Sequence, residues 1–185
     1  IDELEAITEK FGDERRSRLV ADVGEVKIED LIEDEEIIVS VSSGGYVKSV
    51  PSASYKKQGR GGKGVKASSS DEDVIEHLLS TSVHSYLLFF TDQGKVYRAK
   101  AHELPKTTRT AKGSLIHNVL SMGQDEKVQA IIDTRDYETE KFLLIMTEKG
   151  TVKKSAFKDF DSNYKSLQAI KLKDEDRVVS VKTTS

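Results

Sequence analysis

Hydrophobic and polar positions along the chain follow one pattern that occurs three times. Each copy has a largely apolar run of five residues, a turn of the form [Ser/Thr]-x-x-Gly, and a second short segment centred on Val. The apolar runs are residues 37–41, 86–90 and 142–146, and the turn glycines are Gly45, Gly94 and Gly150. Because Gly adopts the positive φ of a tight turn without strain, each copy predicts a β-hairpin.

Two further landmarks recur in step with the hairpins. A second glycine follows the turn glycine by 19 residues in two copies, as Gly64 and Gly113, whereas the third copy has Ser166-Leu167-Gln168 in that region. An acidic pair precedes a further apolar segment at Asp34-Glu35, Asp71-Glu72, Asp125-Glu126 and Asp174-Glu175. A period near 50 residues made of short strands predicts propeller blades rather than a helical solenoid. The alternative is a β-sandwich with coincidental hairpins.

The first residues of the chain have a different pattern. Leu4, Ile7 and Phe11 have helical spacing and Gly12 is a suitable stop, so we interpret residues 1–19 as the end of a helix from a preceding domain. Residues 20–36 then form an acidic connector, and residues 37–185 form about three blades of a partial ring. The expected fold class is therefore all-β and propeller-like, with a short helical segment in front.

Composition excludes several classes of protein. With 36% hydrophobic and 33% charged residues the chain is polar but too apolar for disorder, and it has no Cys for disulfides or thiolate ligands. The longest purely apolar run, residues 86–90, is far too short to span a membrane, so no membrane partner is expected. A reducing cytoplasm suits this composition.

Charge is sorted along the chain, although the net charge is only -3. Positive blocks cover the second hairpin segment and the loop after it, and negative blocks lead into the next repeat. Stacked repeats would align one basic block per blade into a stripe that attracts a polyanion. The alternative is that the lysines only keep edge strands soluble. The balances are -9 for residues 1–36, +6 for 37–70, -5 for 71–93, +5 for 94–114, -4 for 115–148, +5 for 149–173 and -1 for 174–185.

The first basic block contains a glycine-rich heptad, Gln58-Gly59-Arg60-Gly61-Gly62-Lys63-Gly64. Its glycines let a phosphodiester approach the backbone N–H groups while the basic side chains meet its charge. Lys56, Lys57 and Lys66 extend the cluster. The heptad also fits a Gly-x-Gly-x-x-Gly dinucleotide fingerprint, but a polar stretch precedes it and no helix-forming run follows. Since few aromatic residues accompany it, duplex phosphate is the expected target rather than single strands.

This heptad resembles the Q-R-R-G-G-R-G box of the C-terminal DNA-wrapping region of bacterial DNA gyrase A, in the type IIA topoisomerase family. Gly59 stands where the box has a basic residue, and Lys63 replaces Arg. Further stretches similar to that family are residues 12–16, 87–91, 94–98, 109–113 and 150–154. The resemblance implies a β-pinwheel whose blades exchange strands and whose basic rim wraps duplex DNA, so that the whole enzyme introduces negative supercoils with ATP.

The resemblance also implies partners and an absence of chemistry in this region. The partners would be double-stranded DNA, gyrase B and a second copy of gyrase A, in the bacterial cytoplasm at the nucleoid. No cofactor is expected here, because ATP and Mg²⁺ act elsewhere in that enzyme and its attacking tyrosine lies upstream. The four histidines have no metal-ligand spacing, so we expect no catalytic or metal-binding residue. Alternatives are the topoisomerase IV counterpart, which decatenates, and a propeller scaffold for protein partners.

The residues expected to contact DNA are the basic blocks of the three repeats. The strongest contributions are expected from Arg60, Lys63, Arg98, Arg109 and Lys112. The full set is Lys56, Lys57, Gln58, Gly59, Arg60, Gly61, Gly62, Lys63, Gly64, Lys66, Lys95, Arg98, Lys106, Arg109, Lys112, Lys153 and Lys154.

Overall fold

The structure is a computed structural model, and it describes residues 1–13, 16–17, 31–55, 73–135 and 142–185. The chain forms two units, Ile1–Glu33 and Asp34–Ser185. In the first unit, helix α1 spans Asp2–Phe11, with three acidic residues in its first turn and Lys10 in its last, as the helix dipole favours. The helix ends at Gly12, whose N–H donates to the Thr8 carbonyl at 2.7 Å. The expected stop at Gly12 is therefore confirmed.

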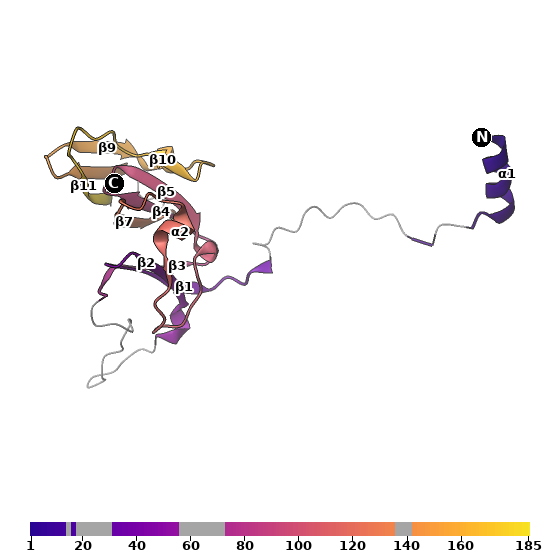
Figure 1. Ribbon diagram of the computed structural model, residues 1–185, viewed down its shortest axis with the longest axis horizontal. Coiled ribbons are helices and arrows are strands. Elements are labelled where there is room, and N and C mark those ends of the chain that lie inside the picture. The colour runs from indigo at the N-terminus through magenta and orange to yellow at the C-terminus, as the bar shows by residue number, and fades with distance from the viewer. Residues whose placement is uncertain (14–15, 18–30, 56–72, 136–141) are drawn as a thin grey trace. The chain divides into compact units, whose positions relative to one another are not determined.

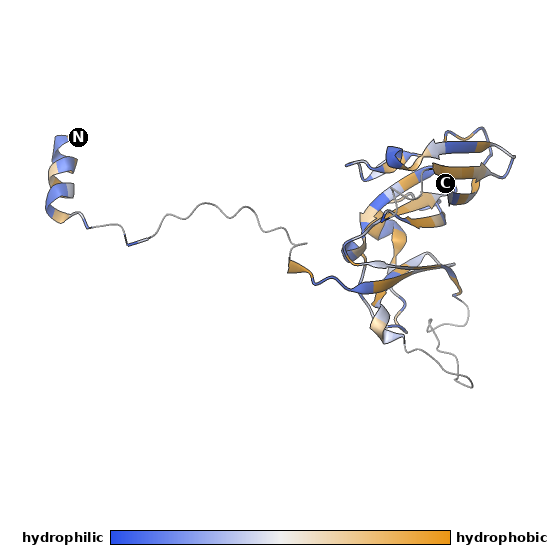
Figure 2. Cartoon of the chain, turned by 180° about the vertical axis from the view of Figure 1, so that it is seen from behind, coloured by the Kyte–Doolittle hydropathy of each residue, from blue (hydrophilic) through white to orange (hydrophobic). Residues whose placement is uncertain are grey.

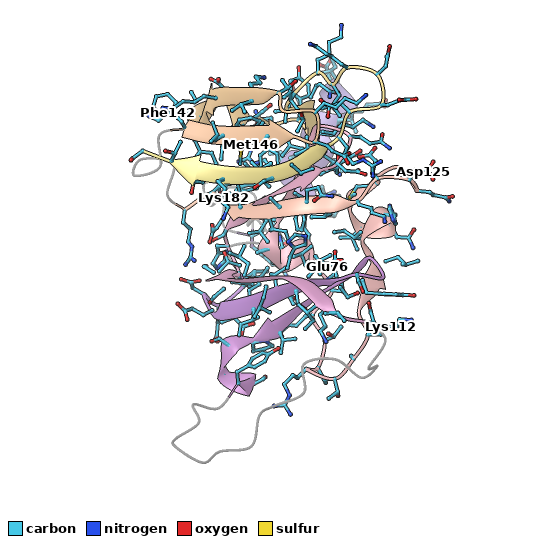
Figure 3. The ribbon with its side chains drawn as sticks, turned by 90° about the vertical axis from the view of Figure 1, so that its left-hand side faces the viewer. Glu76, Lys112, Asp125, Phe142, Met146 and Lys182 are labelled. Carbon is cyan, nitrogen blue, oxygen red and sulfur yellow. The ribbon has the colours of Figure 1, made fainter. Side chains whose placement is uncertain are left out.

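The second unit consists of three antiparallel sheets, which lie one above another in Figures 1 and 3. Each sheet contains one predicted hairpin and the strand that follows an acidic pair, so the prediction of an all-β, propeller-like fold is confirmed. We call the sheets blades 1, 2 and 3. Blade 1 contains β1 (Glu36–Ser42), β2 (Tyr46–Pro51) and β3 (Ile75–Ser82); blade 2 contains β4 (Tyr86–Thr91), β5 (Lys95–Lys100) and β7 (Val128–Asp133); blade 3 contains β8 (Phe142–Thr147), β9 (Val152–Ala156) and β11 (Val178–Thr184).

Blades 1 and 2 each receive a fourth strand from the following repeat. β6 (Ser114–Leu115), followed by helix α2 (Ile116–Leu120), pairs with β2. β10 (Ser166–Gln168) pairs with β5. The strand orders are therefore β3-β1-β2-β6, β7-β4-β5-β10 and β11-β8-β9. Short 3-10 turns follow the second hairpin strands at Ser52–Ser54, Ala101–Glu103 and Phe157–Phe160. This strand exchange joins neighbouring blades through backbone hydrogen bonds.

Acidic residues that precede the third strands satisfy backbone groups of the hairpin turns. Asp73 accepts a hydrogen bond from the Gly44 N–H at 2.9 Å, and Asp176 accepts one from the Lys149 N–H at 3.0 Å. In blade 2 the direction is reversed, because Asp92 in the turn accepts from the Lys127 N–H at 2.9 Å. Asp73, Asp92 and Asp176, which lie near the recurring acidic pairs or in the turn and not within those pairs, therefore stabilise the hairpin turns.

Strand β4 lies between two hydrophobic cores. Leu87 and Phe89 pack into a core shared with blade 1, and Leu88 and Phe90 pack into one shared with blade 3. All four are 1% exposed or less. Because its two faces contribute to different cores, β4 belongs to the central layer of the stack. Each of these side chains contributes about 1.5–3 kcal/mol on burial. Figure 2 shows hydrophobic residues concentrated on the strands of the stacked sheets. No helix in the described part of the chain is long and apolar enough to cross a membrane.

Candidate nucleic-acid interface

The described basic residues that the sequence predicts to contact DNA lie on or beside the strands at one edge of each sheet. In blades 1 and 2 this edge carries the second hairpin strand and the exchanged strand, and in blade 3 it carries β9. We call it the exchange edge. Lys95 and Arg98 lie on β5, Lys153 and Lys154 lie on β9, and Lys112 lies two residues before β6. The opposite edge consists of β3, β7 and β11.

Strand exchange brings the basic loop of the second repeat onto blade 1. The Ser49 N–H donates to the Pro105 carbonyl and the Thr107 N–H donates to the Ser49 carbonyl, both at 2.9 Å. The Arg109 guanidinium donates to the Ser54 carbonyl at 3.5 Å. The loop with Lys106, Arg109 and Lys112 is therefore held against β2 and the 3-10 turn of blade 1, which lie about 55 residues earlier in the sequence.

Lys48, which the charge pattern did not single out, anchors this loop. Its side chain is buried, and its ammonium donates to the Arg109 and Ala111 carbonyls at 2.7 Å each. Burial lowers the pKa of Lys48, although the Asp73 charge acts against this shift. Its place in the apolar segment Val47-Lys48-Ser49-Val50 is the sequence signal for an inward position. Lys153 holds the equivalent position in blade 3 and donates to the Ala169 carbonyl at 2.7 Å.

Lys95 is paired with a buried carboxylate. Its ammonium lies 2.6 Å from Glu126 Oε1, and the Tyr97 hydroxyl donates to the same oxygen at 3.2 Å. The Glu126 side chain is 2% exposed. Burial acts to raise the pKa of Glu126, but hydrogen bonds and the charge of Lys95 outweigh it and leave that pKa lowered. The hydrogen bond to Glu126 raises the pKa of Lys95. This lysine therefore stabilises blade 2, which limits its freedom to bind a phosphate.

Arg98 and Lys106 also have protein partners. The Arg98 guanidinium lies 3.1 Å from Asp161, donates to the Ser162 carbonyl, and lies 3.8 Å from the centroid of the Tyr86 ring. Its side chain is 16% exposed. Lys106 pairs with Glu35 but remains 61% exposed. Between Arg98, Tyr86 and Tyr164 lies a cavity of about 180 Å³.

Lys112 and Lys154 are exposed and lie over aromatic rings. The Lys112 ammonium is 4.1 Å from the centroid of the Tyr46 ring, and the Lys154 ammonium is 4.0 Å from that of Phe142. Neither has a carboxylate within salt-bridge distance in the described segments. Figure 3 shows Lys112 and Phe142 at opposite sides of the stack of sheets. The Lys112 pair belongs to blade 1 and the Lys154 pair to blade 3, which are the two outer sheets of the stack.

The glycine-rich heptad and its flanking lysines lie outside the described residues, which covers Lys56, Lys57, Gln58, Gly59, Arg60, Gly61, Gly62, Lys63, Gly64 and Lys66. Within the described ranges, no group of three or more His, Asp and Glu side chains is arranged to hold a metal ion. The candidate interface thus consists, in the described residues, of cations held by carboxylates, carbonyls and rings.

The chain matches the family described as "DNA gyrase C-terminal domain, beta-propeller" three times, over residues 36–84, 85–134 and 141–185. Each match covers one hairpin together with the strand that follows an acidic pair. Two solved structures with a similar fold are a C-terminal domain of DNA topoisomerase IV (TM-score 0.71) and one of DNA gyrase A (TM-score 0.60), each 30% identical to the chain. They cover 83% and 81% of this chain, which covers 47% and 48% of theirs.

Curated relatives agree with this match. DNA gyrase A of Mycobacterium leprae is 45% identical over 96% of this chain, that of Streptomyces coelicolor 44% over 87%, and that of Clostridium acetobutylicum 38% over 99%. The chain spans 14%, 19% and 22% of the length of these relatives. Because the family matches include all three blades, the chain belongs to the DNA gyrase C-terminal domain family.

Proposed function

We propose that this chain binds duplex DNA along the exchange edge and bends it around the stack of blades. The observation that carries the proposal is that basic residues of the second and third repeats lie on or beside the strands at one edge of successive sheets: Lys112 beside β6 on blade 1, Lys95 and Arg98 on β5 of blade 2, and Lys153 and Lys154 on β9 of blade 3. Phosphate contacts dominate such binding and carry little sequence information. Bending costs on the order of 1–6 kcal/mol per short site, so several contacts along the edge must act together.

In the whole enzyme, wrapping by this region supports ATP-dependent negative supercoiling by a type II topoisomerase. The relatives named as DNA gyrase A support this role. The expected partners are gyrase B and a second copy of gyrase A, and the expected location is the bacterial cytoplasm. On this proposal, residues 1–19 and 20–36 join the blades to a preceding domain, and the basic residues within 56–66 add further phosphate contacts.

The test measures binding of a 150-base-pair duplex to the full chain across a range of salt concentrations. If about six phosphates are neutralised, the slope of log K against log salt is about -5. Lys112→Gln, on the exchange edge, is expected to weaken binding and reduce the slope by about one. Lys182→Gln, which removes the same charge from β11 on the opposite edge, is the matched control and is expected to change neither. A flat salt response, or equal effects of both variants, would refute the proposal.

A second candidate is the corresponding domain of topoisomerase IV, because a C-terminal domain of that enzyme has a TM-score of 0.71 to this chain. Closing a relaxed plasmid with ligase in the presence of the chain separates the two roles. A change in linking number that grows with protein concentration supports wrapping. Binding without such a change supports the topoisomerase IV role.

A further inference from the structure

Blades 2 and 3 share an aromatic–cation pair at equivalent repeat positions. Tyr86 and Phe142 each precede the turn glycine by eight residues, and Arg98 and Lys154 each follow it by four. In the hairpin registers, Leu88 faces Arg98 and Leu144 faces Lys154, so each cation lies diagonally across from the ring two residues earlier. The distances to the ring centroids are 3.8 Å for Arg98 and 4.0 Å for Lys154. Blade 1 has Ile37 and Ser49 at these positions and lacks the pair.

The two pairs differ in what else holds the cation. Arg98 is bound to Asp161 and to the Ser162 carbonyl, so the ring is one of three supports. Lys154 is exposed, and in the described part of the chain its ammonium has no carboxylate within salt-bridge distance. The ring of Phe142 is therefore the contact that holds its long side chain in place.

We propose that Phe142 is a positioning residue for DNA binding, because its ring holds the Lys154 ammonium in one place at the exchange edge of blade 3. This inference rests on the proposed function. A ring attracts a cation through its quadrupole and uses none of the three N–H donors of the ammonium, so Lys154 binds a phosphate while it stays on the ring. A lysine that is already ordered loses less side-chain entropy when the phosphate binds.

The test compares four variants of the full chain on the 150-base-pair duplex. Phe142→Leu keeps an apolar side chain but removes the ring, and it is expected to weaken binding about two- to fivefold, the equivalent of an exposed cation–π contact. Its salt slope stays unchanged, because the charge is still present. Phe142→Tyr restores wild-type affinity. Lys154→Gln weakens binding and reduces the slope by about one, and adding Phe142→Leu to it has no further effect.

Phe11→Leu is the matched control, because the Phe11 ring also has a lysine beside it, Lys10 at 5.5 Å, but in helix α1. It is expected to leave binding unchanged, and circular dichroism confirms that every variant is folded. Additive losses in the double variant, an equal loss in the control, or wild-type affinity in Phe142→Leu would each overturn the inference and leave the proposed function intact. A wild-type chain that does not bind the duplex refutes both.

Discussion

Gly94 holds the strand that blade 2 receives from the third repeat, and replacing it by Ala tests this joint. Its φ is +76°, and an added Cβ would lie 2.5 Å from the Ile170 carbonyl oxygen. The Gly94 carbonyl also accepts hydrogen bonds from the Ala169 and Ile170 N–H groups at 2.9 and 3.1 Å and from the Gln168 side chain at 3.1 Å. The substitution therefore affects both the turn and the segment packed on it.

Gly150→Ala provides the reference for the turn alone. Gly150 occupies the same turn position in blade 3 with φ +84°, and its added Cβ would meet nothing within 4 Å. An L residue in this left-handed region costs about 1–2 kcal/mol. Gly94→Ala carries this cost and also displaces the exchanged segment, which loses two or three hydrogen bonds of about 1 kcal/mol each. We expect a loss of about 4 kcal/mol for Gly94→Ala against about 1–2 kcal/mol for Gly150→Ala.

Urea denaturation of both variants measures the difference, and thermal unfolding provides a second estimate. For a chain of this size, about 1 kcal/mol corresponds to a fall in Tm of about 2–4 °C. Hydrogen exchange locates the effect, since Gly94→Ala is expected to increase exchange at Ala169 and Ile170. Equal destabilisation by the two substitutions would refute the conclusion that contact with the exchanged strand limits this position.

Three further predictions concern charge and the open edge of blade 3. The pKa of Glu126 is lowered in the folded chain, so the ionised carboxylate stabilises the fold above the ordinary pKa of 4.5, and this stabilisation is lost as the pH falls below that value. In Glu126→Gln the free energy of unfolding is therefore expected to depend less on pH below 4.5, as unfolding curves measured in that range would show. Lys48→Met removes the ammonium that holds two loop carbonyls, so protease cleavage between residues 104 and 113 is expected to accelerate, whereas Lys112→Met leaves it unchanged. Val152 is 57% exposed on the edge strand β9, so this edge is expected to promote self-association at high protein concentration, and Val152→Lys is expected to reduce it in sedimentation experiments.

The hairpins could be predicted from the sequence because their signals are local. Each depends on an apolar run and on one glycine at positive φ, and both are visible within a dozen residues. The exchanged strands could not be located in this way, because β6 has only two residues, both exposed, and pairs with a strand 67 residues earlier. Gly113 was the available clue: its φ is +89°, and an added Cβ would lie 2.4 Å from the Val47 carbonyl oxygen.

The role of each lysine was harder to predict than its position. Charge counts place Lys95, Lys153 and Lys154 in basic blocks, but they do not reveal that Lys95 pairs with Glu126 or that Lys153 binds a carbonyl. These partners come from segments 16 and 31 residues away, so only the folded chain brings them together. The net charge of a block therefore predicts which edge carries basic residues. Only the folded structure shows which of those side chains remain available to bind a phosphate.

Strand exchange also makes the exchange edges of blades 1 and 2 the product of two repeats each, so the proposed DNA binding is expected to depend on blade stability. The Arg98 N–H donates to the Lys165 carbonyl at 2.9 Å, so the third repeat's loop is fixed along β5 by the same segment that Gly94 holds. Displacing that segment in Gly94→Ala is expected to move Lys165 from the edge and weaken duplex binding, even at temperatures where blade 2 stays folded. Gly150 holds no exchanged segment in the described residues, so Gly150→Ala is expected to bind normally. If both variants bound DNA equally well, the edge of blade 2 would function without its neighbour, and the composite edge would have no role in binding.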